Sequence, residues 1–160
     1  MRRVLPLAVS AVVLALTTVS PASAADRQVP PDSSNVQLRT DGFPEGQCLD
    51  SDGSGKVYNK PCRPDNEYQK WTWYSRGGNN LMLRNVAAGR CLDSSADGST
   101  YTSECAIQNR YQQWTYREDN VGRYEFKDIA SERCVQYNID NDVWTDTCFS
   151  RGSWYIDAVS

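Results

Sequence analysis

The sequence predicts an all-β fold built from three tandem copies of about 43 residues. The first observation is a pair of cysteine series that each repeat at a constant step of 43 positions: Cys48, Cys91, Cys134 and Cys62, Cys105, Cys148. The second is local, because short apolar runs alternate with turn-forming residues in each copy and helical periodicity is weak. A fixed period of this length is typical of a repeat architecture.

The first 24 residues have the pattern of a secretory signal peptide. Arg2 and Arg3 precede an apolar run over residues 4–19, and the run is followed by the small-residue sequence Ala22-Ser23-Ala24. A membrane anchor would need about 20 unbroken apolar residues, and this run is shorter and interrupted. We therefore expect residues 1–24 to be removed and residues 25–35 to form a flexible leader. The protein is then expected to be secreted, extracellular and monomeric.

The composition of the remaining chain excludes some partners. Residues 25–160 hold 15 basic and 20 acidic residues and no histidine. Nucleic-acid binding requires a basic stripe against the phosphates, so nucleic acid is not an expected partner. No further apolar span is present, so a membrane is not an expected partner either. Six cysteines in a secreted chain predict three disulfides, although their number alone leaves the pairing open.

Each copy is expected to contribute four short strands, which gives twelve in all. In the middle copy, which spans about 79–121, the strands are predicted at 81–84, 90–93, 100–105 and 113–117. The Asp97-Gly98 pair and the Gly53-Ser54-Gly55 run predict hairpin turns. The outer copies span about 36–78 and 122–160.

A copy of this size cannot bury a core alone, so the three should close around a shared axis. Trp154 comes three residues early because the third copy is shortened after Cys148. The predicted common core contains these residues: Leu38, Leu83, Phe126, Trp71, Trp114 and Trp154.

Two segments carry a family resemblance: CLDSDGSGKVYNKPCRPDNEYQKW from Cys48, and CLDSSADGSTYTSECAIQNRYQQW from Cys91. With their Cys-x-Asp and Gln-x-Trp signatures they resemble the subdomains of ricin-type lectins and of the related family 13 carbohydrate-binding modules. The resemblance covers the chain from about residue 36 to the end. It implies a β-trefoil with one potential sugar site per copy and one disulfide closing each hairpin, so that the pairs are Cys48–Cys62, Cys91–Cys105 and Cys134–Cys148.

Hairpin geometry independently supports a sugar site at Asp50. If Cys48 faces Cys62 across an antiparallel pair, then Asp50 faces Lys60 and lies diagonal to Tyr58, roughly 7–8 Å away. These side chains project to one side, because residues two apart share a face. An aromatic ring beside a carboxylate suits a sugar, whose C–H groups stack on the ring while its hydroxyls donate to the acid.

The same reasoning places Asp93 opposite Ser103 and diagonal to Tyr101 in the second copy. The alternative is that Tyr58 and Tyr101 only cover the disulfides and fill space between hairpins. The resemblance further implies that Gln69 and Gln112 buttress the aspartates.

Many members of the resembled family have a sugar-binding asparagine directly before that glutamine, where this chain has Tyr68 and Tyr111. Asn66 and Asn109, three positions before the glutamines, are therefore the nearest asparagine candidates for the carbohydrate site.

The third copy departs from this pattern. Gln136 stands at the aspartate position and Gly152 at the glutamine position. The same pairing would put Asp146 directly opposite Gln136, close to Trp144. We therefore expect a weaker or altered third site made by Trp144 and Asp146.

A calcium site is an alternative interpretation of the turns. Two segments match the first half of a calcium-binding loop: Asp50, Asp52, Ser54, Gly55 and Asp93, Ser95, Asp97, Gly98. Because the flanking residues are predicted to be strands, a polar hairpin turn is the simpler explanation. No metal and no cofactor are expected.

Catalysis has little support in the sequence. Without histidine, neither a Ser-His nor a Cys-His pair can form, and cysteines paired in disulfides cannot act as nucleophiles. The sequence therefore predicts a secreted, non-enzymatic carbohydrate-binding protein with shallow sites in the first two copies. The alternative is a secreted protein-binding trefoil, such as a protease inhibitor, with degenerate sugar sites.

Overall fold

The computed structural model describes residues 30–40, 46–148 and 152–160. The predicted signal peptide, 1–24, and residues 25–29 of the predicted leader lie outside these residues. The first repeat contains the strands β1 (Ser34–Thr40), β2 (Gln47–Ser51), β3 (Val57–Pro61) and β4 (Trp71–Gly77), with the short 3₁₀ helix η1 (Glu67–Gln69) between β3 and β4.

The other two repeats follow the same order. The second contains β5 (Asn80–Asn85), β6 (Cys91–Ser94), β7 (Thr100–Ser103), η2 (Arg110–Gln112) and β8 (Trp114–Glu118). The third contains β9 (Tyr124–Asp128), β10 (Cys134–Tyr137), β11 (Val143–Asp146) and β12 (Ser153–Val159). The four strands predicted for the middle copy are confirmed, with ends that differ by one or two residues.

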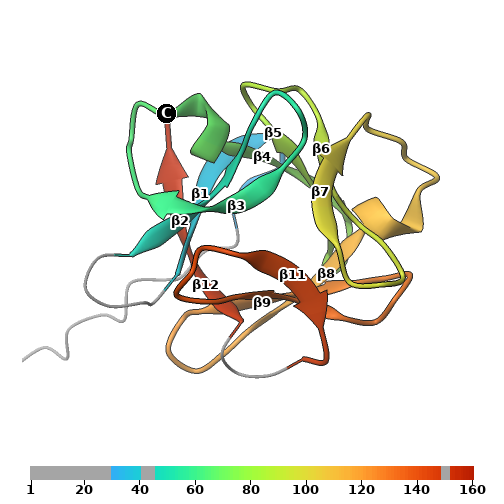
Figure 1. Ribbon diagram of the computed structural model, residues 1–160. Helices are drawn as coiled ribbons and strands as arrows, with labels where there is room; N and C mark the ends of the chain where they lie inside the picture. The colour runs from blue at the N-terminus through green and yellow to red at the C-terminus, as the bar shows by residue number, and fades with distance from the viewer. Residues whose placement is uncertain (1–29, 41–45, 149–151) are drawn as a thin grey trace, which may run out of the picture.

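Six strands close into a barrel. The first and last strands of each repeat pair with each other, as β1–β4, β5–β8 and β9–β12. The last strand of each repeat also pairs with the first strand of the next, as β4–β5, β8–β9 and β12–β1. Because β12 returns to β1, the ring has no open edge (Figure 1).

The remaining strands form three hairpins, β2–β3, β6–β7 and β10–β11. The turn of each hairpin is bonded to a strand of another hairpin in cyclic order. Gly55 O accepts from Thr102 N at 2.7 Å, Gly98 O from Thr145 N at 2.8 Å, and Asn141 O from Asn59 N at 2.9 Å. A six-stranded barrel with a triplet of hairpins is a β-trefoil, so the predicted fold class is confirmed.

The predicted core residues lie together inside this fold. Leu38, Leu83, Phe126, Trp71, Trp114 and Trp154 are each 0–1% exposed. Two of the indoles are also hydrogen-bonded, since Trp71 Nε1 donates to Leu49 O at 2.9 Å and Trp114 Nε1 to Leu92 O at 3.3 Å. These bonds attach the barrel core to the hairpin strands β2 and β6.

Part of the predicted leader is held against the barrel. Ser33 N donates to Trp73 O at 2.7 Å, and Ser75 N donates to Asp32 Oδ1 at 2.7 Å. Strand β1 then begins at Ser34, two residues before the predicted domain start. Residues 32–35 are therefore part of the folded domain, because their polar groups bond to β4. In the described part of the chain, no helix is both long and apolar enough to cross a bilayer.

Candidate functional site

The three disulfides join the cysteines that the family resemblance implied: Cys48–Cys62, Cys91–Cys105 and Cys134–Cys148, each with a sequence separation of 14. The predicted register is nevertheless wrong by two residues. Cys48 pairs with Lys60, and Asp50 pairs directly with Tyr58.

The turn of the hairpin explains this difference. Asp52 N donates to Lys56 O at 3.1 Å, and this short turn sets the register of β2 and β3. Cys62 therefore lies beyond Pro61, the last residue of β3, and its disulfide reaches back to Cys48 with a Cα–Cα distance of 4.9 Å. The disulfide geometry permits this offset, so its presence does not require the two cysteines to be directly opposite.

The same correction applies to the other hairpins. Asp93 pairs with Tyr101, and Cys91 with Ser103. In the third repeat Asp146 pairs with Cys134 instead of Gln136, which pairs with Trp144. The acid and the aromatic residue of the first two repeats are therefore direct cross-strand neighbours, closer than the diagonal arrangement that was predicted.

In the first repeat, a fixed set of donors holds the Asp50 carboxylate. Asp50 is 2% exposed, and its Oδ2 accepts from Asn66 Nδ2 and Gln69 Nε2, both at 3.0 Å. The Gln69 amide is itself fixed, because it donates to Pro61 O at 3.1 Å and accepts from Arg63 N at 2.8 Å. Gln69 thus occupies the buttressing position that the resemblance implied.

The second repeat repeats this network with one more donor. Asp93 Oδ2 accepts from Asn109 Nδ2 and Gln112 Nε2 at 3.0 Å and from Ser103 Oγ at 2.6 Å. Among the described residues, no donor reaches Asp93 Oδ1, although this oxygen is buried. One carboxylate oxygen is therefore held by three groups while the other has no protein partner.

Asn66 and Asn109 support the carboxylates and also begin the 3₁₀ helices. Asn66 Oδ1 accepts from Tyr68 N at 3.1 Å, and Asn109 Oδ1 accepts from Tyr111 N at 3.0 Å. Each asparagine amide thus accepts a hydrogen bond at its oxygen and donates one to the aspartate from its nitrogen. The sequence signal for this role was an asparagine, a preferred N-cap residue, three positions before a glutamine.

Burial raises the pKa of Asp50 above its usual 3.8, because desolvation disfavours the charged form. Hydrogen bonds from Gln69 and Asn66, the charge of Lys60 and the backbone of Ser51 act in the opposite direction and offset only part of this effect. The carboxylate is thus enclosed by donors at one oxygen and has a reduced preference for ionisation.

The aromatic side chains opposite the carboxylates are partly exposed. Tyr101 is 36% exposed, and its hydroxyl donates to Ser94 O at 3.2 Å. The Tyr58 ring is half-buried, and the Lys60 ammonium lies over it, 4.6 Å from the ring centroid. Either ring thus offers an accessible surface beside an acid.

The turn of another hairpin borders each of these aromatic residues. Isolated bridges join Tyr58 to Asp142, Tyr101 to Lys56, and Trp144 to Ser99. Sequence reasoning treated each site as belonging to one repeat and missed these neighbours. A period alone does not reveal them, because it says nothing of which turn lies against which strand.

The third repeat lacks a carboxylate at the position of Asp50. Gln136 Nε2 donates to Thr147 O at 3.5 Å, the carbonyl that corresponds to Pro61 and Glu104 in the other repeats. A Cβ on Gly152 would lie 2.4 Å from Val135 O and 2.7 Å from the Gln136 amide, so only glycine fits there. The Gln136 side chain thus takes over part of the glutamine's role, and Asp146 turns to accept from its neighbour Thr147 N at 2.7 Å.

The aspartates that resemble a calcium loop bond within their own turns. Asp52 Oδ1 accepts from Ser54 N at 2.9 Å and from Lys56 N at 3.0 Å. Asp97 accepts from the Ser95 hydroxyl and from Ser99 N, and the pKa of Asp97 falls to about 2, chiefly because of the Ser95 bond. Polar hairpin turns therefore account for the sequence match.

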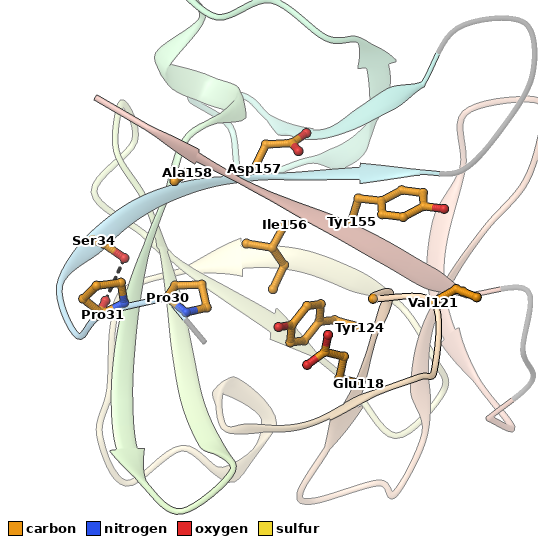
Figure 2. A pocket seen from close by; sticks show the side chains of 11 residues that line it. Pro30, Pro31, Ser34, Glu118, Val121, Tyr124, Tyr155, Ile156, Asp157 and Ala158 are labelled. Carbon is orange, nitrogen blue, oxygen red and sulfur yellow. Dashed lines mark hydrogen bonds between the residues drawn. The ribbon is translucent and has the colours of Figure 1, made fainter. Parts of the chain in front are cut away.

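A separate pocket of about 480 Å³ lies on the barrel, between β12, the start of β1 and the turn after β8. In Figure 2 the Tyr124 ring lies below Ile156 and beside the Glu118 side chain, and Asp157 lies above Ile156. None of the predicted carbohydrate-site residues lines it. The pocket and the hairpin sites are thus different places on the molecule.

Comparison with solved structures gives the same fold. The designed threefold-symmetric protein ThreeFoil superposes with a TM-score of 0.67 at 16% identity, covering 78% of this chain and 98% of its own. The BEL β-trefoil gives 0.69 at 17% identity, covering 82% and 97%. The Haemophilus ducreyi cytolethal distending toxin gives 0.66 at 18%, covering 87% and 93%. At these identities the similarity concerns the fold alone.

Comparison of sequences identifies the family. No curated protein matches this chain. The model of the ricin-type β-trefoil lectin domain matches residues 28–114, which include both Cys-x-Asp and Gln-x-Trp signatures. This match spans more than half of the chain, and the three hairpins with their disulfides agree with it. The chain belongs to the ricin-type β-trefoil lectin domain family.

Proposed function

We propose that this protein is a secreted, non-catalytic and monomeric lectin that binds carbohydrate at the hairpins of its first two repeats. Membership of the ricin-type lectin family supports carbohydrate binding in general. The proposed sites centre on Asp50 with Tyr58 and on Asp93 with Tyr101. Asn66, Gln69, Asn109 and Gln112 act behind them by orienting the carboxylates.

The observation that carries this proposal is the unequal use of the two Asp93 oxygens. Three side chains donate to Oδ2, while Oδ1 is buried and has no donor among the described residues. A buried acceptor without a partner costs about 1–3 kcal/mol. A sugar hydroxyl that donates to Oδ1 would remove this cost, while the sugar ring stacks on Tyr101.

Non-catalytic binding is supported by the chemistry of the available side chains. The chain has no histidine, and all six cysteines form disulfides. The carboxylates of Asp50 and Asp93 are each fixed by amide donors in separate hairpins. Such fixed groups can orient a sugar by accepting from its hydroxyls.

The test is a glycan array followed by affinity chromatography on a matching polysaccharide. Replacement of both rings, Tyr58→Ala with Tyr101→Ala, should reduce retention at least tenfold, because each site loses its stacking surface. Each single variant should lose less, since the other site still binds. The melting temperature should stay close to that of the unmodified protein because both rings are partly exposed. Retention by the folded double variant would refute the site assignment.

A second candidate function, protein binding, is favoured by one exposed residue. Ile139 is 95% exposed in the turn of the third hairpin, where the other repeats have Gly53 and Ala96. Such a lone apolar side chain without a counterpart could contact a protein partner. A panel of extracellular proteases with the Ile139→Ser variant tests this. Inhibition that depends on Ile139, with an empty glycan array, would favour the protein-binding function.

A further inference from the structure

The residues that flank the aromatic side chain differ in charge between the three hairpins. Each hairpin has an aromatic residue with a polar residue two positions before and two positions after it, all on one face of the strand. The three sets are Lys56, Tyr58, Lys60, then Ser99, Tyr101, Ser103, and then Asp142, Trp144, Asp146. At a constant step of 43, the same positions are cationic, neutral and anionic in turn.

Both lysines of the first hairpin lie close to the Tyr58 ring. The Lys60 ammonium is 4.6 Å from the ring centroid and donates to the tyrosine hydroxyl at 3.3 Å. The Lys56 ammonium is 5.9 Å from the same centroid. Within the described part of the chain, neither lysine forms an ion pair with a carboxylate. Two cations are thus held beside the proposed sugar position with their charge available.

The second hairpin uses the corresponding position differently. Ser103 donates its hydroxyl to Asp93 at 2.6 Å, so it completes the support of the carboxylate. Lys60 makes no such bond to Asp50, whose amide donors are Asn66 and Gln69. The lysine is therefore not a substitute for the serine. One N–H of its ammonium donates to the Tyr58 hydroxyl, and the other two can contact a ligand.

One anionic group borders the first site from another repeat. Asp142 is bridged to Tyr58 through the backbone, and its Oδ2 accepts from Asn138 Nδ2 at 3.1 Å. This bond holds the carboxylate of Asp142 toward its own turn. The other charges around Tyr58 are those of the two lysines and of Asp50 and Asp52, which attract Lys60 without forming an ion pair with it among the described residues.

We propose that the first repeat selects an acidic sugar, a hexuronic acid residue whose carboxylate is bound by Lys60 with the help of Lys56, whereas the second repeat selects a neutral sugar. This inference rests on the proposed function, because the sugar must first dock between Asp50 and Tyr58. There, ring hydroxyls donate to Asp50 and the uronate carboxylate accepts from the lysine. The amine of Lys60 is protonated at neutral pH, and the hydrogen bond to Tyr58 raises its pKa further.

The test compares oligouronides with their methyl esters, which keep the ring hydroxyls and lose only the charge. Galacturonate and glucuronate oligomers and their esters are titrated by calorimetry at low ionic strength into the Asp93→Asn protein, in which the second site is disabled. At least one acid should bind about threefold or more tightly than its ester, and added salt should reduce this preference. Equal affinity for acid and ester would overturn the proposal.

The variants are chosen from the chain itself. Lys60→Ser introduces the residue of the second hairpin and should abolish the preference for the acid without weakening the ester. Lys60→Arg should keep the preference, and Arg117→Ser, which removes an exposed charge from β8, should leave it unchanged. A preference that survives Lys60→Ser would overturn the role of this lysine.

A further variant separates this inference from the function on which it rests. Asp50→Ala should abolish binding of both the acid and the ester. If Asp50→Ala weakens both ligands while Lys60→Ser changes neither, the lectin function stands and the charge selection fails. If the Asp93→Asn protein binds no acid and no ester while the unmodified protein binds another sugar on the glycan array, the charge selection fails and the lectin function stands. If neither protein binds any glycan, the function and the inference both fail.

Discussion

The Asp50 and Asp93 side chains are buried carboxylates that are stabilised from one side only. In each case an asparagine and a glutamine donate to Oδ2 at 3.0 Å. For Asp50, burial favours the protonated acid, and these donors oppose it. The result for Asp50 is a pKa that is raised above 3.8 despite two amide donors and a nearby lysine.

This raised pKa predicts how the first site responds to acid. Sugar hydroxyls donate to the ionised carboxylate, so affinity should be highest at neutral pH and should fall as the pH drops through the raised pKa. The fall should therefore begin above the range expected for a free aspartate. Calorimetry of a neutral oligosaccharide with the Asp93→Asn protein between pH 7 and about 4 measures it. Asp50→Asn should bind weakly with no pH dependence, and a constant affinity in the protein with Asp50 would contradict the prediction.

The sign is opposite for the contribution of Asp50 to folding. Because its pKa is higher in the folded protein than in the unfolded chain, the stabilising protonated form is fully present below 3.8. This contribution is lost as the pH rises through the folded-state pKa. The proposed sugar binding thus favours the ionised form of Asp50, whereas the stability of the fold favours its protonated form.

At the scale of the hairpin, the sequence predicted the strands, the turns and the face shared by acid and ring. The register error of two residues did not change this face, because an even shift keeps acid and ring on the same side of the hairpin, whereas a shift of one residue would have separated them. The register itself was not predictable from the cysteines, since Cys62 bonds to Cys48 from beyond the end of β3. The predicted pairing of Asp146 with Gln136 was wrong for the same reason, since Asp146 pairs with Cys134.

Other features of the hairpins depend on contacts that the period does not encode. The cap made by Asn66 becomes visible only when η1 is placed against Asp50. The close approach of Gly152 to Gln136 likewise joins residues 16 positions apart and is not encoded in the period. The sequence shows that the residues two positions before and after the aromatic residue are lysines in the first repeat, serines in the second and aspartates in the third. Only the structure shows that the Lys60 ammonium lies against the Tyr58 ring.

The turn of the second hairpin tests how the hairpins are joined. Gly98 has φ +95°, and a Cβ there would lie 2.6 Å from Thr145 O of the third hairpin. Gly98→Ala should lower the free energy of unfolding by about 2–3 kcal/mol, through backbone strain and loss of the bond to Thr145. Urea denaturation measures this loss.

Two other glycines serve as controls for this variant. Gly77 has φ +91° with nothing within 4 Å of an added Cβ, so Gly77→Ala should show the strain alone, about 1 kcal/mol. Gly53→Ala, where the nearest atom would be the Tyr68 hydroxyl at 3.8 Å, should be almost neutral. Equal losses for Gly98 and Gly77 would show that the contact with the third hairpin contributes little.

At the scale of the whole molecule, covalent and noncovalent links act on different parts. Each disulfide closes only its own hairpin, over a sequence separation of 14. The repeats are joined to one another by backbone pairing, above all by β12 with β1, which pair over six residue positions from Asn35–Val159 to Thr40–Trp154. The barrel is therefore closed without any disulfide between repeats.

This division predicts the effect of removing one disulfide. Cys134→Ala with Cys148→Ala should lower the free energy of unfolding by about 3 kcal/mol, as expected for a closed loop of this length. Unfolding should remain a single transition by circular dichroism and tryptophan fluorescence, because the third repeat shares its strands with both neighbours. A separate early transition of the third repeat would contradict this view of the molecule.

The cyclic bonds from Gly55 to Thr102, from Gly98 to Thr145 and from Asn141 to Asn59 have a consequence for engineering. The aromatic residue of each hairpin is bordered by a turn that is encoded in a different third of the gene. Grafting one third from a homologue would therefore change the surroundings of two hairpins at once. A graft that is meant to transfer one hairpin with its surroundings must therefore include the turn of the other hairpin that is bonded to it.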